Sequence, residues 1–83
     1  MEPAKHFSIT LPKNRREEVQ VALTEYEQHK CCDIRIYAGD ADAKVPTRKG
    51  ICIRVEQLPA LRAALQQVEA EAQRLGFLRK EAA

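Results

Sequence analysis

Apolar and polar residues alternate with a period of two along four stretches of the chain, residues 7–11, 19–26, 31–37 and 51–55. Such alternation is typical of strands that bury one face and expose the other. The stretch 19–26 also contains Glu, Ala and Gln, which favour helices, so a helix stays open there. The pattern predicts four strands, each with one apolar side.

From Glu56 onward the apolar period changes to alternating steps of three and four, which predicts one long amphipathic helix. The apolar positions are Leu58, Leu61, Leu65, Val68, Ala72 and Leu75. Pro59 would fall in the first turn, where backbone N–H groups lack helical partners, and Gly76 would end the helix. About twenty residues at 1.5 Å each span roughly 30 Å, which is longer than the small sheet is wide. We therefore expect the helix to cover the sheet and its overhanging end to pack on a second copy as a homodimer.

The remaining segments are expected to be tails and connections. Residues 1–6 and 78–83 would be tails of a single domain spanning 1–83, and 13–18 a solvated turn after Pro12. Connections are expected at 27–30 and 39–44, and a loop at 45–50 leading into the last strand. The fold class is α+β.

Composition limits the class of protein. A chain of 83 residues has room for one domain with a marginal core, which favours self-association. The net charge is only +2, and the excess lies in residues 31–55, with five basic against three acidic residues. Three cysteines without disulfide-framework spacing indicate a reducing cytosol, and no apolar run reaches membrane-spanning length. We expect no membrane partner.

The residues with binding chemistry gather on one side of the predicted sheet. A proline, a hydroxyl, two cations and a glycine occur together in the stretch Pro46-Thr47-Arg48-Lys49-Gly50, which we interpret as a phosphate-gripping loop. The side that the helix leaves open would display Thr24, Tyr26, Arg35, Tyr37 and Arg54. Rings interleaved with cations suit single-stranded nucleic acid, because bases stack on rings while cations meet phosphates. Asn and Gln are scarce there, so readout of base sequence is not expected.

Each of these residues has a simpler interpretation. Arg48 and Lys49 can be solvated loop charges, and Arg35 can form an ordinary surface pair with Asp33 or Asp42. Tyr26 and Tyr37 can pack against neighbouring side chains, as aromatic residues on strand edges often do.

Metal binding and catalysis are not expected. His29 lies near Cys31 and Cys32, but adjacent strand residues face opposite sides and no second Cys or His pair has zinc spacing. A nucleophilic cysteine needs an activating base, and His6 and His29 are the only histidines. We expect no metal, no cofactor and no enzymatic activity.

Residues 44–53 (KVPTRKGICI), followed by Glu56, Gln57, Leu58 and Leu61, resemble the strand-to-helix signature of the transcriptional positive cofactor 4 coactivator family. The segment 33–37 (DIRIY) is similar to the Asp-Ile-Arg strand of that family. The resemblance covers roughly residues 7–75 and is most specific over 33–61. The family's eukaryotic members have a tryptophan where this chain has Ala38, so one stacking platform is missing unless Tyr37 replaces it. The serine-rich arm of some members is absent, which fits a compact bacterial or phage version.

The resemblance implies a twisted antiparallel four-stranded sheet with one long C-terminal helix, paired into a homodimer that binds single-stranded DNA or melted duplex without sequence preference. By the same resemblance Arg48 and Lys49 match the loop cations, Arg35 the strand arginine, Tyr26 the stacking aromatic and His29 a nearby basic position. Our candidate site adds Thr47 and Tyr37.

We therefore expect a transcription regulator of the coactivator type, located in the cytoplasm with the bacterial nucleoid, or in the nucleus if the source is eukaryotic. Two alternatives remain open. The protein can be a protein-interaction module that acts through the long helix and its dimer, with the basic loop incidental. The same sheet face can also bind RNA, because no residue here distinguishes a 2′-hydroxyl.

Overall fold

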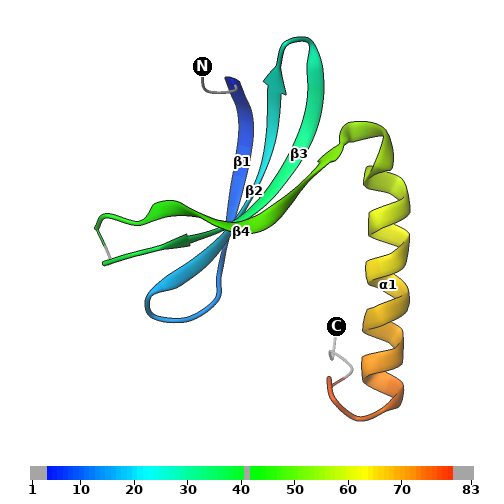
Figure 1. Ribbon diagram of the computed structural model, residues 1–83. Coiled ribbons are helices and arrows are strands. Elements are labelled where there is room, and N and C mark those ends of the chain that lie inside the picture. Colours follow the sequence, from blue (N-terminus) through cyan, green and yellow to red (C-terminus); the bar gives the residue numbers. More distant parts are fainter. Residues whose placement is uncertain (1–3, 41, 80–83) are drawn as a thin grey trace.

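The computed structural model describes residues 4–40 and 42–79, which form one antiparallel sheet followed by a helix (Figure 1). The strands are β1 (Ala4–Pro12), β2 (Glu17–Tyr26), β3 (His29–Ala38) and β4 (Val45–Arg54). A 3₁₀ turn, η1 (Val55–Gln57), leads into the helix α1 (Leu58–Arg74). Each strand pairs with the next in the order β1-β2-β3-β4. The predicted fold class is confirmed, and the helical alternative for 19–26 is wrong.

The strands are longer than the apolar alternation indicates. Ala4–His6 belong to β1 although they were expected in a polar tail, and β2 begins inside the expected turn 13–18. Backbone hydrogen bonds of a ladder continue past the last apolar side chain, because they do not depend on side-chain polarity. The expected tail positions 1–3 and 80–83 lie outside the described residues.

A two-residue turn, Glu27-Gln28, connects β2 to β3 in place of the expected connection 27–30. Both residues have positive φ, 49° and 69°, which is the backbone of a type I′ turn. Such a turn usually contains Asn or Gly, and neither residue occurs here to indicate it. Its consequence is that Tyr26 and His29 stand directly opposite each other.

The strand register divides the sheet into two faces, because residues that pair across strands point to the same side. The face that we call the polar face carries Lys5, Gln20, Thr24, Tyr26, His29, Asp33, Arg35, Tyr37 and Arg54. The opposite face, the apolar face, carries Phe7, Ile9, Leu11, Val19, Val21, Leu23, Cys32, Ile34, Ile36, Ile51 and Ile53. The predicted division of side chains between the two faces is confirmed.

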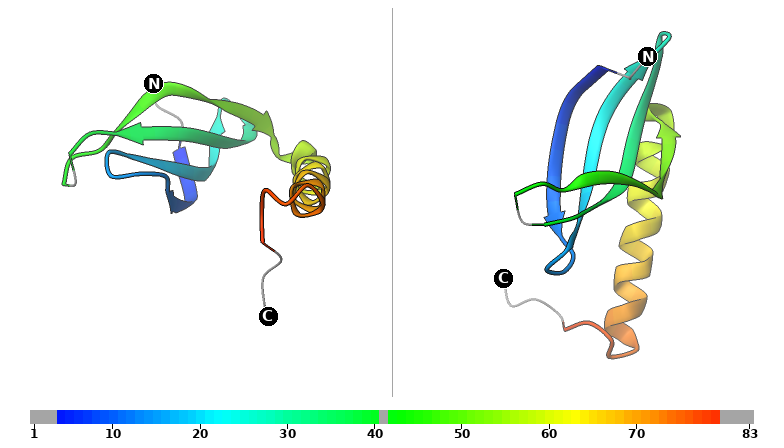
Figure 2. Two further views of the ribbon diagram at one scale, coloured as in Figure 1. Left: turned by 90° about the horizontal axis from the view of Figure 1, so that it is seen from below. Right: turned by 60° about the vertical axis from the view of Figure 1, so that its left-hand side comes forward.

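The expectation that α1 covers the apolar face of its own sheet is wrong. Figures 1 and 2 show α1 beside the sheet, joined to it at one end through η1. Only the start of the described helix meets the apolar face, where Leu58 shares an apolar hollow with Phe7, Leu23 and Cys32. The radius of gyration is 15.1 Å, against about 12 Å for a compact chain of this length. The turn η1 directs the chain away before the helical stripe can reach the strands.

The end of α1 agrees with the sequence. Gly76 has φ +79°, and its N–H donates to the carbonyl of Gln73 while the N–H of Phe77 donates to Ala72. This is the Schellman pattern of a helix C-terminus, in which glycine adopts the left-handed conformation at little cost. Pro59 lies in the first turn, as expected. In the part of the chain described, no helix combines the length and apolarity that crossing a membrane requires.

Candidate nucleic-acid interface

The expected phosphate loop is an irregular part of β4. Gly50 pairs with Arg35 and Pro46 pairs with Tyr37, so three residues of β4, Thr47 to Lys49, stand opposite the single residue Ile36 of β3. The prediction of a loop over 45–50 is therefore wrong, because these residues belong to β4 and strand pairing continues on both sides of the irregularity. A bulge of this kind bends an edge strand and re-aims its side chains.

Gly50 allows the two strands to approach each other beside the bulge. A Cβ at this position would lie 2.4 Å from the carbonyl oxygen of Ile34 and 2.8 Å from the Cα of Arg35. Both neighbours are backbone atoms that cannot rotate away. The glycine of the Arg-Lys-Gly motif is therefore required by close packing at the end of the bulge.

Arg35 holds the bulge in place. Its Nε and Nη2 donate to the two carboxylate oxygens of Asp33 at 3.0 and 2.8 Å, and its Nη1 donates to the carbonyl of Thr47 at 3.1 Å. The hydrogen bonds to Asp33 are the main reason that the pKa of Arg35 is raised. The pairing with Asp33 that the sequence allowed is thus present, and it fixes the guanidinium against β4.

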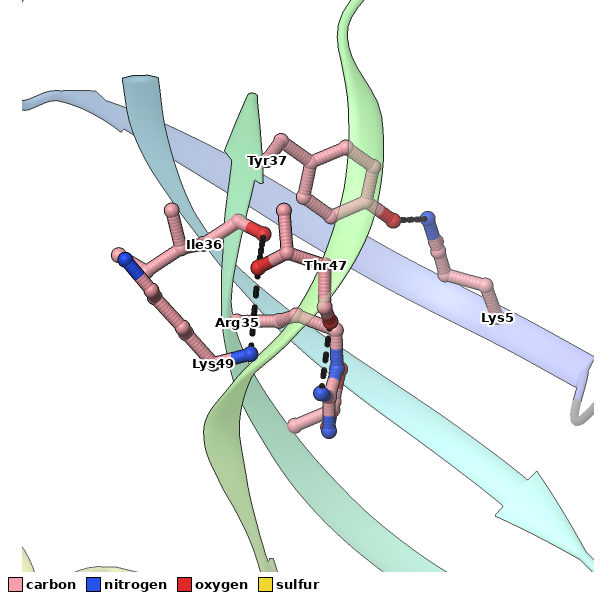
Figure 3. A network of polar contacts seen from close by, with 7 residues as sticks. Lys5, Arg35, Ile36, Tyr37, Thr47 and Lys49 are labelled. Atoms are coloured by element: carbon pink, nitrogen blue, oxygen red, sulfur yellow. Dashed lines mark hydrogen bonds and ion pairs between the residues drawn. The ribbon is translucent and has the colours of Figure 1, made fainter. Parts of the chain in front are cut away.

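Thr47 also has its hydroxyl committed to the backbone. Its Oγ1 donates to the carbonyl of Ile36 at 2.7 Å and accepts from the N–H of Lys49 at 3.2 Å (Figure 3). A hydroxyl has one proton to donate, so this one cannot also donate to a phosphate while the bond to Ile36 persists. Thr47 therefore shapes the bulge.

Arg48 and Lys49 are the exposed cations of the bulge. Within residues 4–40 and 42–79, no carboxylate lies within ion-pair distance of either side chain. Figure 3 shows the Lys49 side chain extending toward Ile36, away from Tyr37. Lys49 also contributes to lowering the pKa of Glu17. The two cations thus stand on the edge strand of the sheet, and no carboxylate of the described chain pairs with them.

Tyr26 and His29 form a second group at the other end of the polar face. Each flanks the β2–β3 turn, and both are exposed. His29 begins β3 and Arg35 lies near its far end, a separation of about 20 Å along the strand. The structure therefore places Tyr26, His29, Arg35 and Tyr37 on the polar face, in two groups, and leaves Thr47, Arg48 and Lys49 in the bulge of the edge strand.

Tyr37 lies beside the bulge and has a partner that the sequence did not indicate. Lys5 Nζ donates to the Tyr37 hydroxyl at 3.4 Å and lies 5.7 Å from the ring centroid (Figure 3). It also donates to Gln20 Oε1 at 2.6 Å. Lys5 was assigned to a tail, and the alternation that would have placed it is interrupted by a β-bulge between Lys5 and Phe7.

Ala38, which stands where the family of the resemblance has a tryptophan in its eukaryotic members, pairs with Val45. The register places this pair on the apolar side of the sheet, since neighbouring residues of a strand point to opposite faces. Tyr37 is therefore the aromatic side chain that β3 presents to the polar face near the bulge.

A family model described as Transcriptional Coactivator p15 (PC4) matches residues 11–64 of this chain. This segment contains β2, β3, β4 and the start of α1, and hence nearly all of the residues described above. Comparison with curated proteins gives no match.

Solved structures of a bacterial and a phage protein are similar to this chain. The crystal structure of a PC4 homologue from Burkholderia pseudomallei has 27% sequence identity and a TM-score of 0.69, covering 74% of this chain and 84% of its own. The bacteriophage T5 homologue of the eukaryotic coactivator PC4, implicated in recombination-dependent DNA replication, has 22% identity and a TM-score of 0.63. That alignment covers 98% of this chain and 100% of the phage chain, and it supports the shared fold.

Proposed function

The chain belongs to the PC4 family of transcriptional coactivators, and on this premise we propose that it binds single-stranded DNA without sequence preference and without catalysing a reaction. Arg48 and Lys49 of the β4 bulge contact phosphates, and Tyr26 and Tyr37 stack on bases. His29 contributes a donor beside Tyr26. The role of the protein is in transcription or in the handling of exposed DNA strands.

The observation that carries this proposal is the bulge itself. It presents two exposed cations that no carboxylate of the described chain pairs with, on a backbone fixed by Arg35, Thr47 and Gly50. Exposed charges of this kind are available to phosphate oxygens, and rigid presentation lowers the entropy lost on binding.

The aromatic side chains favour a single strand over a duplex. Tyr26 is 44% exposed, and its ring can stack only on a base that is not enclosed in a double helix. Arg35 and Thr47, which we predicted as direct contacts, act in this proposal by positioning the bulge. Their hydrogen-bonding groups are directed to Asp33, Thr47 and Ile36.

We further propose that the protein is a homodimer in which the apolar face and the apolar stripe of α1 are covered by a second copy. Phe7, Ile9 and Ile51 of the sheet are 58%, 51% and 53% exposed, and Leu65 and Val68 of α1 are 57% and 64% exposed. Among the described residues, only Ala22 and Cys32 are buried apolar side chains. Burial this small cannot offset the entropy of ordering the chain, so a second surface is needed.

The test is a fluorescence anisotropy titration with single-stranded DNA, the matching RNA and duplex DNA over a range of salt concentrations. We expect single-stranded DNA to bind with little dependence on base composition. Arg48→Ala combined with Lys49→Ala should weaken binding equally for all sequences. The log–log salt dependence should flatten by about 0.7 for each phosphate that the variant no longer binds.

The matched control is Arg62→Ala combined with Arg74→Ala, which removes the same charge from α1. An equal drop in affinity in this control would mean that net charge, and not the bulge, governs binding. Unchanged affinity of the bulge variant at low salt contradicts the proposal. Tighter binding of the RNA would assign the same face to RNA.

A further inference from the structure

Lys5 occupies the polar face at the edge opposite to the bulge. β1 and β4 are the two edge strands of the sheet, and Lys5 lies on β1 while Arg48 and Lys49 lie on β4. The Lys5 side chain reaches over β2 to contact the side chains of Gln20 on β2 and Tyr37 on β3. Figure 3 shows its ammonium group meeting the Tyr37 hydroxyl.

The charge of Lys5 is not neutralised by this contact. Gln20 and Tyr37 offer neutral oxygen atoms, and in the described part of the chain no carboxylate lies within ion-pair distance of Lys5. The register also places the carboxylates of Asp33 and Glu18 on the polar face, and both are already engaged. Asp33 bonds to Arg35, and Glu18 lies 3.9 Å from Lys44.

The ammonium group also retains capacity for a ligand. It has three protons to donate, and the bonds to Gln20 and Tyr37 use at most two of them. These bonds hold a long, exposed side chain in one orientation above Tyr37. An oriented ammonium group without a paired carboxylate, placed beside an aromatic ring, can receive a phosphate oxygen from a nucleotide whose base meets the ring.

We propose that Lys5 is a phosphate-binding residue, and that the bound strand crosses the sheet from the β4 bulge over Tyr37 to β1. This inference rests on the proposed function and adds to it the direction of the bound strand. Neighbouring strands lie about 4.8 Å apart, and the register places Lys5 level with Cys31, five residues along β3 from Ile36, so the path from the bulge to Lys5 is diagonal and spans roughly 22 Å at the level of the backbone. The Tyr37 side chain, whose hydroxyl contacts Lys5 Nζ, bridges part of this distance.

The experiment measures the affinity of Lys5→Met for a single-stranded oligonucleotide as a function of salt. Methionine retains an unbranched apolar stem and removes the charge. We expect weaker binding and a log–log salt slope flatter than that of the wild type by about 0.7, the value for one phosphate. Lys5→Arg keeps the positive charge and should restore most of the slope.

The matched control is Lys30→Met, which removes an exposed lysine that the register places on the apolar side, opposite Glu25. We expect it to change the salt slope less than Lys5→Met. An unchanged slope in Lys5→Met, or an equal change in Lys30→Met, overturns the assignment of Lys5. A wild-type chain that binds no oligonucleotide refutes the proposed function itself, so the two failures can be told apart.

Discussion

The two faces of the sheet are both open to solvent, yet the polar face has hydrogen-bond partners for its side chains, whereas the apolar face has little to cover its side chains. On the polar face, each of the three guanidinium nitrogens of Arg35 donates a hydrogen bond to Asp33 or Thr47. On the apolar face, Phe7 and Ile9 are more than half exposed, and of the described helix only the start reaches the surface. One face has satisfied most of its own polar groups and keeps a few cations free of carboxylates in the described chain, whereas the other lacks most of its apolar cover.

This difference indicates what each face binds. Exposed apolar surface is stabilised by contact with other apolar surface, and it gains little from a charged strand. Unpaired cations on a fixed backbone gain from phosphates and are destabilised by burial against protein. This is the physical basis of our proposal that nucleic acid binds the polar face and that a second copy covers the apolar face together with α1. Three sets of substitutions test how the two surfaces differ.

The largest effect is expected from Leu65→Asp combined with Val68→Asp on α1. Burial of a Leu or Val side chain contributes about 1.5–3 kcal/mol, and a homodimer carries each change twice, so the four side chains account for roughly 6–12 kcal/mol of association. This corresponds to a rise of at least about 10⁴ in the dimer dissociation constant. Sedimentation velocity measures the change. Ala63→Asp with Ala70→Asp places the same charges on the opposite side of the helix and should leave the dimer intact. Equal dissociation in both variants would contradict the proposed interface.

The sequence could predict which side chains share a face, but it could not predict what covers them. Alternation assigns Val21 and Ile34 to one side whatever lies above them, and the three-and-four spacing of Leu61 and Leu65 gives a helix whatever it packs against. Where the helix lies depends on the direction in which η1 leaves β4. That direction is set by a few backbone dihedral angles, which leave no periodic signal in the sequence.

The second change tests how the backbone of the polar face is held. In Gly50→Ala, the added methyl group would lie 2.4 Å from the carbonyl oxygen of Ile34. Overpacking of this kind costs about 1–3 kcal/mol, which urea unfolding measures. Oligonucleotide affinity should fall as well, because the bulge must move away from Arg35.

Gly76→Ala is the control for this change. No atom lies within 4 Å of its Cβ position, and its φ of +79° is strained for alanine. Stability should therefore fall through backbone strain, while the oligonucleotide affinity of the folded protein stays unchanged. Retained affinity in folded Gly50→Ala would mean that the bulge need not be fixed.

The sequence could predict which residues form most of the candidate site, but only partly what each residue does there. Arg48, Lys49 and Gly50 stood out as a motif, and the position of Tyr37 followed from alternation. That Thr47 commits its hydroxyl to Ile36 depends on a bulge of three residues against one, which no local pattern indicates. Lys5 was missed for a related reason. A β-bulge after Lys5 interrupts the alternation, and the contact with Tyr37 spans 32 positions of sequence.

The smallest expected effect is a change in the pH dependence of stability caused by Glu17, which begins β2 after the β1–β2 loop. The side-chain amide of Asn14 and the ammonium of Lys13 donate to its carboxylate, both at 2.9 Å, and these contacts lower the pKa of Glu17 below its ordinary value of 4.5. A carboxyl with a lowered pKa in the folded state stabilises the fold above its unfolded pKa, and this contribution is lost as the pH falls through the folded value. The wild type should therefore lose thermal stability as the pH is lowered from about 6 to about 3.

Glu17→Gln should lose less stability than the wild type over that range, because the amide cannot be protonated there. Glu69→Gln makes the same change at an exposed helical carboxylate that has no ion pair in the described residues, and it should follow the wild type. Thermal unfolding at several pH values compares the three proteins. Parallel curves for Glu17→Gln and the wild type would show that the Asn14 and Lys13 contacts do not hold the loop in solution. A flatter curve confined to Glu17→Gln would show that polar contacts stabilise the end of the sheet beside the bulge, where Lys49 also acts on this carboxylate.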